Sequence, residues 1–200
     1  MKKMISMALA LLFNISLMAG VDNGQTAPDF TLKGHDGKTY KLSEVMKEKG
    51  HIVLEWFNNE CPYVEKHYGT GNMQALQKKY TEKGIKWYSI ISSAEGKQGY
   101  RDMASATKTK QERGQASNAT LLDPTGKVGK MYGAKTTPHM YVINPEGKIV
   151  YQGAIDDNSS YKKDSVKSAN NYLVAALDAS LAGKPVKEAK TKPYGCSVKY

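Results

Sequence analysis

The chain contains two cysteines, and the residues around Cys61 are typical of a reactive thiol. A short apolar run, Ile52 to Phe57, predicts a buried strand because bulky side chains occupy both of its faces. The polar triplet Asn58-Asn59-Glu60 ends this run. Pro62 then favours the start of a helix, since the first helical position needs no partner for an N–H. The pattern places Cys61 at or near the N-cap of this helix.

A sulfur at that position would face unpaired backbone N–H groups and the positive end of the helix dipole. Both favour the thiolate, which is the nucleophilic form of cysteine, and both lower the pKa of the thiol. We therefore predict that Cys61 is an accessible, redox-active thiolate. The alternative is an inert core cysteine, since free cysteines are among the most buried residues. The carboxyl edge of a strand, where open α/β sheets keep their sites, favours the functional interpretation.

The second cysteine, Cys196, could form a disulfide with Cys61 in an oxidising compartment. The loop that it would close spans about 135 residues, which is worth about 5 kcal/mol in the chain-entropy model. A permanent structural disulfide is therefore the alternative to a catalytic pair. Val64 stands where a CxxC motif would have its second cysteine, and no cluster of Cys and His is suited to zinc. We expect no metal and no cofactor.

Residues 1–20 have the pattern of a secretory signal peptide, with Lys2 and Lys3 before an apolar stretch that ends at Ala19. The stretch is shorter than the about 20 residues of a membrane span. An uncleaved anchor is the alternative, because Leu17 is large for a position close to a cleavage site. We expect an exported protein of the periplasm or cell envelope, without stable membrane insertion once the signal is cleaved.

The formal net charge is +10. Its lysines are scattered rather than clustered, which favours a solvated basic face, with weak attraction to anionic lipid as the alternative. Because we expect export, we predict no nucleic-acid partner.

The remaining pattern predicts one mixed α/β domain, residues 21–182, and a Lys-rich tail, residues 183–200, that is too polar to pack fully. Parallel strands joined by helices, with an antiparallel pair at the end, predict a central sheet flanked by helices. We expect His67, nearly two helical turns beyond Cys61, on the surface. The predicted elements are a hairpin and short helix (25–50), the strand before Cys61, a helix (62–83) interrupted at 69–71, a strand (85–92), an exposed helix within 94–118, a short strand (121–122), a small helix ending near 133, two strands around a turn (136–151) and a helix (164–181).

Several segments together resemble a redoxin domain, the thioredoxin-fold alkyl hydroperoxide reductase/thiol-specific antioxidant family. The resemblance covers about residues 25–182, and the ending Lys192 to Tyr200 is similar to the Gly-Cys-Ser ending of a peroxiredoxin-like branch. The segments that carry it are Ala27-Pro28-Asp29-Phe30-Thr31-Leu32, Asp36-Gly37-Lys38, Leu42-Ser43-Glu44, the Cys61-Pro62-Tyr63-Val64 strand-helix junction, Thr137-Pro138 and Pro145-Glu146-Gly147-Lys148.

The resemblance implies a thioredoxin-like fold with an N-terminal hairpin and a C-terminal tail. It implies that Cys61 is the attacking cysteine and that Pro138 is a cis-proline beside its sulfur. Thr137 would offer backbone groups to a bound thiol or peptide. The remaining residues of the expected active-site shell are Pro62, Trp56, Asn58 and Glu60.

Two departures from typical peroxiredoxins bear on the activity. Their Pro-x-x-x-Thr/Ser-x-x-Cys motif is replaced by Leu54 and Asn58, and both arginines of the chain, Arg101 and Arg113, lie far from Cys61 in sequence. In typical peroxiredoxins the Thr or Ser hydroxyl of this motif and an arginine beside the cysteine donate hydrogen bonds to the peroxide. Loss of each of these donors costs about 3 kcal/mol of transition-state stabilisation. Peroxidase activity is therefore expected to be weakened. A carboxylate near the thiol would raise its pKa, and Glu55 could relay a proton only if it points toward the sulfur.

Three functions are compatible with these residues. We favour a thiol-disulfide oxidoreductase in which Cys61 attacks a disulfide and Cys196 resolves the mixed disulfide. The second is a thiol peroxidase, in which Cys196 captures a sulfenic acid on Cys61. The third is a non-catalytic binding module with a structural disulfide. The expected partners are protein thiols and disulfides, or a small thiol or peroxide, together with an external reductant.

Overall fold

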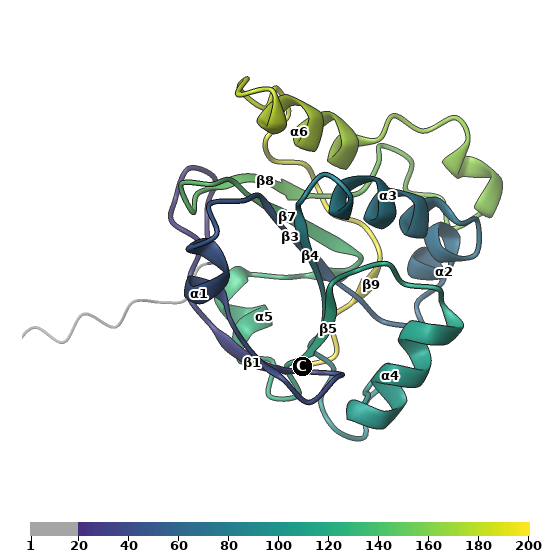
Figure 1. Ribbon diagram of the computed structural model, residues 1–200. Coiled ribbons are helices and arrows are strands. Elements are labelled where there is room, and N and C mark those ends of the chain that lie inside the picture. Colours follow the sequence, from purple (N-terminus) through teal and green to yellow (C-terminus); the bar gives the residue numbers. More distant parts are fainter. Residues whose placement is uncertain (1–19) are drawn as a thin grey trace, which may run out of the picture.

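The computed structural model describes residues 20–200, so nearly all of the expected signal peptide lies outside the described residues. A seven-stranded mixed sheet forms the centre, in the order β2-β1-β5-β4-β3-β7-β8 (Figure 1). The strands are β1 (Thr31–Gly34), β2 (Thr39–Lys41), β3 (Ile52–Trp56), β4 (Lys86–Ile91), β5 (Ala119–Leu122), β7 (His139–Ile143) and β8 (Ile149–Gly153). Two short strands, β6 (Thr136–Thr137) and β9 (Cys196–Ser197), form a separate antiparallel pair.

The predicted strand before Cys61 is β3, and it lies in the middle of the sheet. It runs parallel to β4 and antiparallel to β7, and its five residues are all buried. Burial on both faces explains why the segment lacks the alternation of a half-exposed strand. The central position also fixes the point at which the chain leaves the sheet for the loop that carries Cys61.

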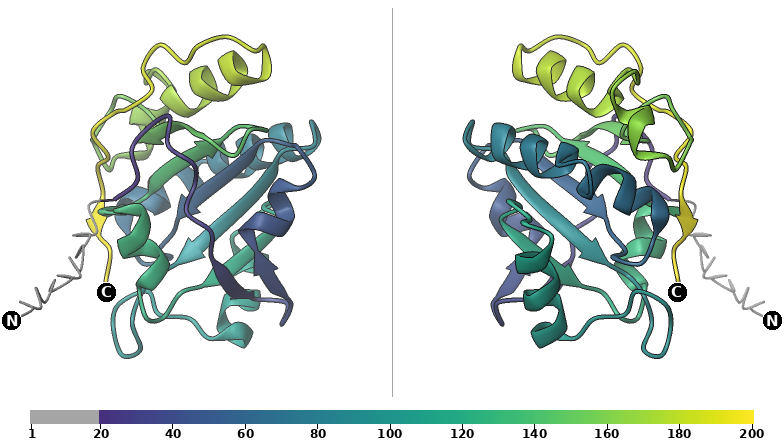
Figure 2. Two further views of the ribbon diagram at one scale, coloured as in Figure 1. Left: turned by 90° about the vertical axis from the view of Figure 1, so that its left-hand side faces the viewer. Right: turned by 90° about the vertical axis from the view of Figure 1, so that its right-hand side faces the viewer.

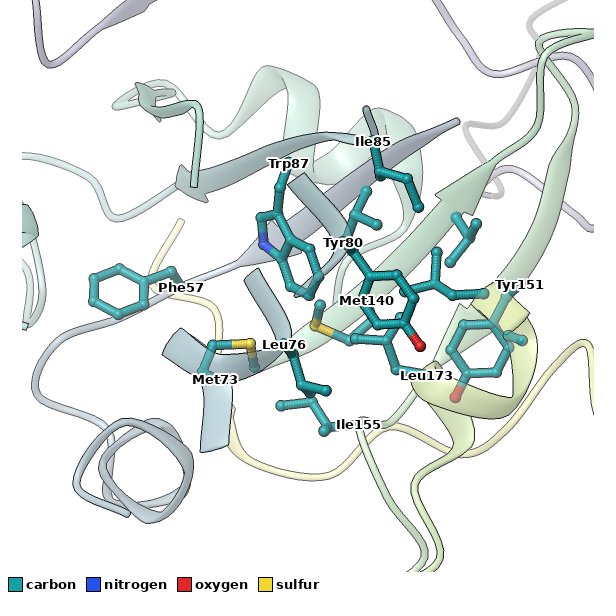
Figure 3. Close-up of a cluster of buried hydrophobic side chains, with 14 of the residues drawn as sticks. Phe57, Met73, Leu76, Tyr80, Ile85, Trp87, Met140, Tyr151, Ile155 and Leu173 are labelled. Atoms are coloured by element: carbon teal, nitrogen blue, oxygen red, sulfur yellow. The ribbon is translucent and has the colours of Figure 1, made fainter. Parts of the chain in front are cut away.

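Helices cover both faces of the sheet, as the two buried side-chain clusters show. One cluster joins Val53 and Phe57 to the helices α2 (Pro62–Tyr68), α3 (Asn72–Thr81) and α6 (Tyr172–Leu181). Figure 3 shows part of this cluster, where Trp87 and Met140 of the sheet meet Leu76 of α3. On the opposite face, Leu54 and Trp56 pack with α1 (Leu42–Met46) and α5 (Lys127–Tyr132). This is the thioredoxin-like arrangement that the resemblance implies.

Most of the predicted elements are confirmed. The break at residues 69–71 separates α2 from α3, and the exposed helix within 94–118 is α4 (Met103–Glu112). The predicted helix over residues 164–181 is divided in the structure. Lys163–Val166 forms a short 3-10 turn, and α6 is a separate helix that begins at Tyr172. Asn171 ends the intervening stretch by accepting the backbone N–H of Val174, which caps α6 and sets its first turn.

The C-terminal tail lies along the domain, and none of residues 183–200 is fully buried, in line with the expectation that it is too polar to pack fully. Figure 2 shows this yellow segment running from α6 along one side of the molecule to the C-terminus. We call residues 189–200 the C-terminal strap. Backbone hydrogen bonds hold it at Gln152, Lys135 and Ala94, so polar main-chain groups supply the attachment that a hydrophobic pattern would otherwise provide. Among residues 20–200 no helix is long and apolar enough to cross a membrane.

Candidate active site

Cys61 occupies the position that the sequence predicts for it. It is the N-cap residue of α2, with extended backbone angles of φ −87° and ψ 125°, and Pro62 is the first helical residue. The loop that leads to it is closed by Asn58, whose carbonyl and side-chain oxygens accept the backbone N–H groups of Cys61 and Glu60. The strand end, the loop and the helix start therefore hold the sulfur at one edge of the sheet.

The sulfur of Cys61 is covered, which differs from the expected accessible thiol. Its side chain is 0 % exposed. Its Sγ lies 3.0 Å from the carbonyl oxygen of Thr137 and 2.6 Å from the Sγ of Cys196, and both cysteines are free thiols. The cover is thus in part the C-terminal strap, and two polar atoms touch the sulfur. A partner can reach Cys61 only if the strap moves or if it reacts first at the half-exposed Cys196.

The Thr137–Pro138 peptide bond is cis, as the resemblance implies for Pro138. Thr137 directs its carbonyl oxygen to the Cys61 sulfur and pairs, as part of β6, with Cys196 of β9. A third contact between the strap and this region joins the N–H of Val198 to the carbonyl of Lys135. The strap is therefore an added strand along the edge that carries the proline, and this pairing brings the two sulfurs together.

The environment of Cys196 favours its protonated form. Burial is the largest cause that raises its pKa, and the neighbouring Cys61 raises it further. Both causes act in the same direction, so Cys196 keeps its proton more strongly than an ordinary thiol.

The remaining shell residues are not all close to the sulfur. Asn58 is buried in the loop, whereas Pro62 and Glu60 are exposed beside Cys61. Trp56 packs in the cluster on the opposite face of the sheet and donates its indole N–H to Ser92 at 3.0 Å. Trp56 therefore lies on the other face of the sheet from the cluster that contains Cys61, and not, as expected, beside the sulfur.

Both arginines, which lie far from Cys61 in sequence, contact the loop and helix around it. Arg113 donates to the carbonyl oxygen of Asn59 at 3.0 Å, bonds the side chain of the same residue, and forms an ion pair with Glu65. Arg101 donates to Glu60 at 3.1 Å. In the sequence, the only indication of a shared role was that both arginines lie in one polar segment. The guanidinium groups are engaged with the loop and its carboxylates rather than with the sulfur.

His67 is buried, so the expectation of a surface position is wrong. Asn72 donates to its Nδ1 at 2.9 Å, and its Nε2 lies 3.3 Å from the hydroxyl of Tyr194. Burial lowers the pKa of His67 to about 4, so the ring is neutral at pH 7. The helical spacing of His67 did not reveal this position because the strap, far along the chain, covers that side of α2.

Glu55 belongs to a different buried polar group, on the α2 and α3 side of the sheet. Its carboxylate accepts hydrogen bonds from four side chains, those of Tyr68, Gln77, Trp87 and Ser89. Burial raises its pKa, and these donors oppose the rise. The hydrogen bonds of the Glu55 carboxylate are therefore made to these four side chains. In the described part of the chain, no group of three or more His, Cys, Asp or Glu side chains could hold a metal ion.

Comparisons with known proteins agree with this geometry. The family model described as Redoxin matches residues 22–173. The chain is similar to the thiol-disulfide oxidoreductase ResA of Bacillus thuringiensis subsp. konkukian (strain 97-27), with 26% identity over 129 residues, which is 64% of this chain and 68% of the relative.

Two solved structures have the same fold. An uncharacterized conserved protein from Geobacillus kaustophilus is 31% identical, with a TM-score of 0.74 over 90% of this chain and 92% of the other. A putative thiol:disulfide interchange protein DsbE from Chlorobium tepidum is 24% identical, with a TM-score of 0.55 over 79% of this chain and 99% of the other. At that identity the second similarity concerns the fold alone.

Proposed function

Because this chain belongs to the Redoxin family, we propose that it is a thiol-disulfide oxidoreductase in which Cys61 attacks and Cys196 resolves. The observation that carries the proposal is the 2.6 Å separation of the two sulfurs at the start of α2. The similarity to proteins named thiol-disulfide oxidoreductases supports the reaction class. The raised pKa of Cys196 supports the order of attack, since the thiol that keeps its proton is the poorer first nucleophile.

The reaction proceeds by two exchanges. The Cys61 thiolate attacks one sulfur of a partner disulfide, which forms a mixed disulfide and releases the other partner sulfur as a thiolate. Cys196 then loses its proton to solvent and attacks the Cys61 sulfur, which releases the second partner thiolate. The partner disulfide is reduced by two electrons and the Cys61–Cys196 pair is oxidised by two. An external dithiol reductant returns the pair to the thiols.

The substrate class in this proposal is a disulfide in a protein or peptide, or an oxidised small thiol. The strap and residues 21–182 work as one unit, since Cys196 lies in the strap and Cys61 in the redoxin domain. Export to the periplasm or cell envelope is also part of the proposal, and its support is the signal-like sequence of residues 1–20.

The test is trapping of intermediates with glutathione disulfide, followed by mass spectrometry of the reduced protein without residues 1–20. We expect the wild type to lose two hydrogens as the internal disulfide forms. The Cys196→Ser variant should accumulate a glutathione adduct on Cys61, because no second thiol resolves it. The Cys61→Ser variant should form no internal disulfide. Reaction of Cys61→Ser at the wild-type rate would overturn the proposal.

Two further measurements separate the alternatives. Consumption of hydrogen peroxide much faster than disulfide exchange would identify a peroxidase instead. An internal disulfide with a reduction potential below about −300 mV, together with no exchange on partners, would identify a structural disulfide.

A further inference from the structure

Tyr194 places its hydroxyl in a buried polar cluster that the exchange chemistry does not use. The hydroxyl donates to Asp156 and accepts a hydrogen bond from the ammonium of Lys66 at 3.1 Å. Lys66 and Asp156 form an ion pair at 3.3 Å whose side chains are 0 % and 2 % exposed. His67 Nε2 also lies 3.3 Å from the same hydroxyl.

The cluster depends on Tyr194 for part of its hydrogen bonding. Buried charges are stable only when their remaining donors and acceptors are satisfied. The backbone carbonyl of Asn158, at 2.6 Å, supplies one acceptor to Lys66, and the hydroxyl of Tyr194 supplies another. The ring of Tyr194 adds a cation–π contact, since the Lys66 ammonium lies 5.1 Å from its centroid. Removing the hydroxyl leaves both charges with fewer partners.

This cluster is linked through the chain to both cysteines. Lys66 and His67 lie on α2, the helix that begins at Cys61, while Tyr194 stands two residues before Cys196. The same ring contacts Tyr63 in the first turn of α2, with 5.8 Å between the ring centroids. Tyr194 therefore joins the strap to the helix of the attacking cysteine at a point next to the resolving cysteine.

We propose that Tyr194 is the positioning residue of the resolving step, holding Cys196 against Cys61 by docking the strap on the buried Lys66–Asp156 pair. The inference rests on the proposed function. Docking raises the effective concentration of the Cys196 sulfur at the mixed disulfide, because the strap no longer samples undocked conformations. The second exchange then outruns attack by an external thiol.

The kinetic test uses Tyr194→Phe and Tyr194→Ala with glutathione disulfide as the oxidant. We expect formation of the Cys61 adduct to be unchanged or faster, because a looser strap uncovers the sulfur. Resolution of the adduct should slow by about tenfold in Tyr194→Phe, the effect of about 1.4 kcal/mol, and more in Tyr194→Ala. Tyr161→Phe is the matched control, since Tyr161 is 61 % exposed. Equal resolution rates in Tyr194→Phe and wild type would overturn the inference.

A second readout does not depend on exchange. In the reduced protein, hydrogen exchange of the backbone amides of 190–198 and alkylation of Cys196 by iodoacetamide should both be faster in Tyr194→Phe. Unchanged values would show that Tyr194 does not anchor the strap. If the wild type formed no Cys61–Cys196 disulfide, the proposed function would fail, and with it the resolving role of Tyr194. In that case, hydrogen exchange and alkylation would still show whether Tyr194 anchors the strap.

Discussion

Cys196 pairs with Thr137 across a two-residue antiparallel ladder, and this pairing sets its sulfur beside Cys61. The relationship explains how a cysteine near the C-terminus reaches the start of α2. The carbonyl of Thr137 contacts the Cys61 sulfur, so one residue holds both cysteines. The pairing of the strap with β6 therefore covers the Cys61 sulfur and places Cys196 against it.

Gly195 allows the strap to approach this edge, and Gly195→Ala should weaken closure. Its φ is +142°, and a Cβ there would lie 2.2 Å from the carbonyl oxygen of Thr137. We expect the equilibrium constant for the Cys61–Cys196 disulfide against glutathione to fall by tenfold or more. Gly183→Ala is the control, because Gly183 also has a positive φ but a Cβ there would meet no atom within 4 Å. The same disulfide constant in both variants would contradict this explanation.

Arg113 should support the loop before Cys61. Arg113→Ala removes the hydrogen bonds to Asn59 and the ion pair with Glu65. We expect a loss of about 1–3 kcal/mol in the free energy of unfolding and a several-fold slower reaction of Cys61 with glutathione disulfide. The control is Lys163→Ala, which removes an exposed partner of Glu65 and should cost about 0–1 kcal/mol. Equal losses in the two variants would show that the loop contacts carry no stability.

His67 should make the protein less stable in acid. Its folded-state pKa of about 4 lies below the unfolded value of about 6.5, so the unfolded state binds more protons between these pH values. The contribution of His67 is therefore fully present above about pH 6.5 and falls by about 1.4 kcal/mol per unit as the pH drops toward 4. Urea unfolding of wild type and His67→Gln at pH 7 and pH 5 measures it. Parallel losses of stability in the two proteins would refute the assignment.

Glu55 should act on stability and not on the thiol reaction. In Glu55→Gln an amide NH₂ must face side chains that donate to the carboxylate, and the indole N–H of Trp87 can only donate. Each donor left without an acceptor costs about 1–3 kcal/mol in the free energy of unfolding, which denaturant titration measures. The exposed Glu82→Gln should leave stability unchanged. A large drop in the reaction rate of Cys61 in Glu55→Gln would instead make Glu55 a proton relay.

Local patterns were sufficient to predict the part of the site that is continuous in the chain. The apolar run before Asn58, the position of Pro62 and the break at residues 69–71 predict β3, the N-cap position of Cys61 and the separation of α2 from α3. The predicted mixed sheet flanked by helices is also observed. These features depend on neighbouring residues, whose preferences act over a few positions and are visible in their order.

The contacts that complete the site were decided by the tertiary structure. The two cysteines of the sequence already indicated a Cys61–Cys196 pair, but no spacing in the sequence indicates that Arg113 and Tyr194 reach the region of Cys61 from distant segments. The strap docks through main-chain pairing and a few buried polar side chains, so it carries no hydrophobic period that would predict packing. The sequence alone therefore determined which cysteine begins the helix. The fold decided that the sulfur is covered and which residues cover it, because long-range hydrogen bonds form only once the sheet and helices have set the surfaces that they join.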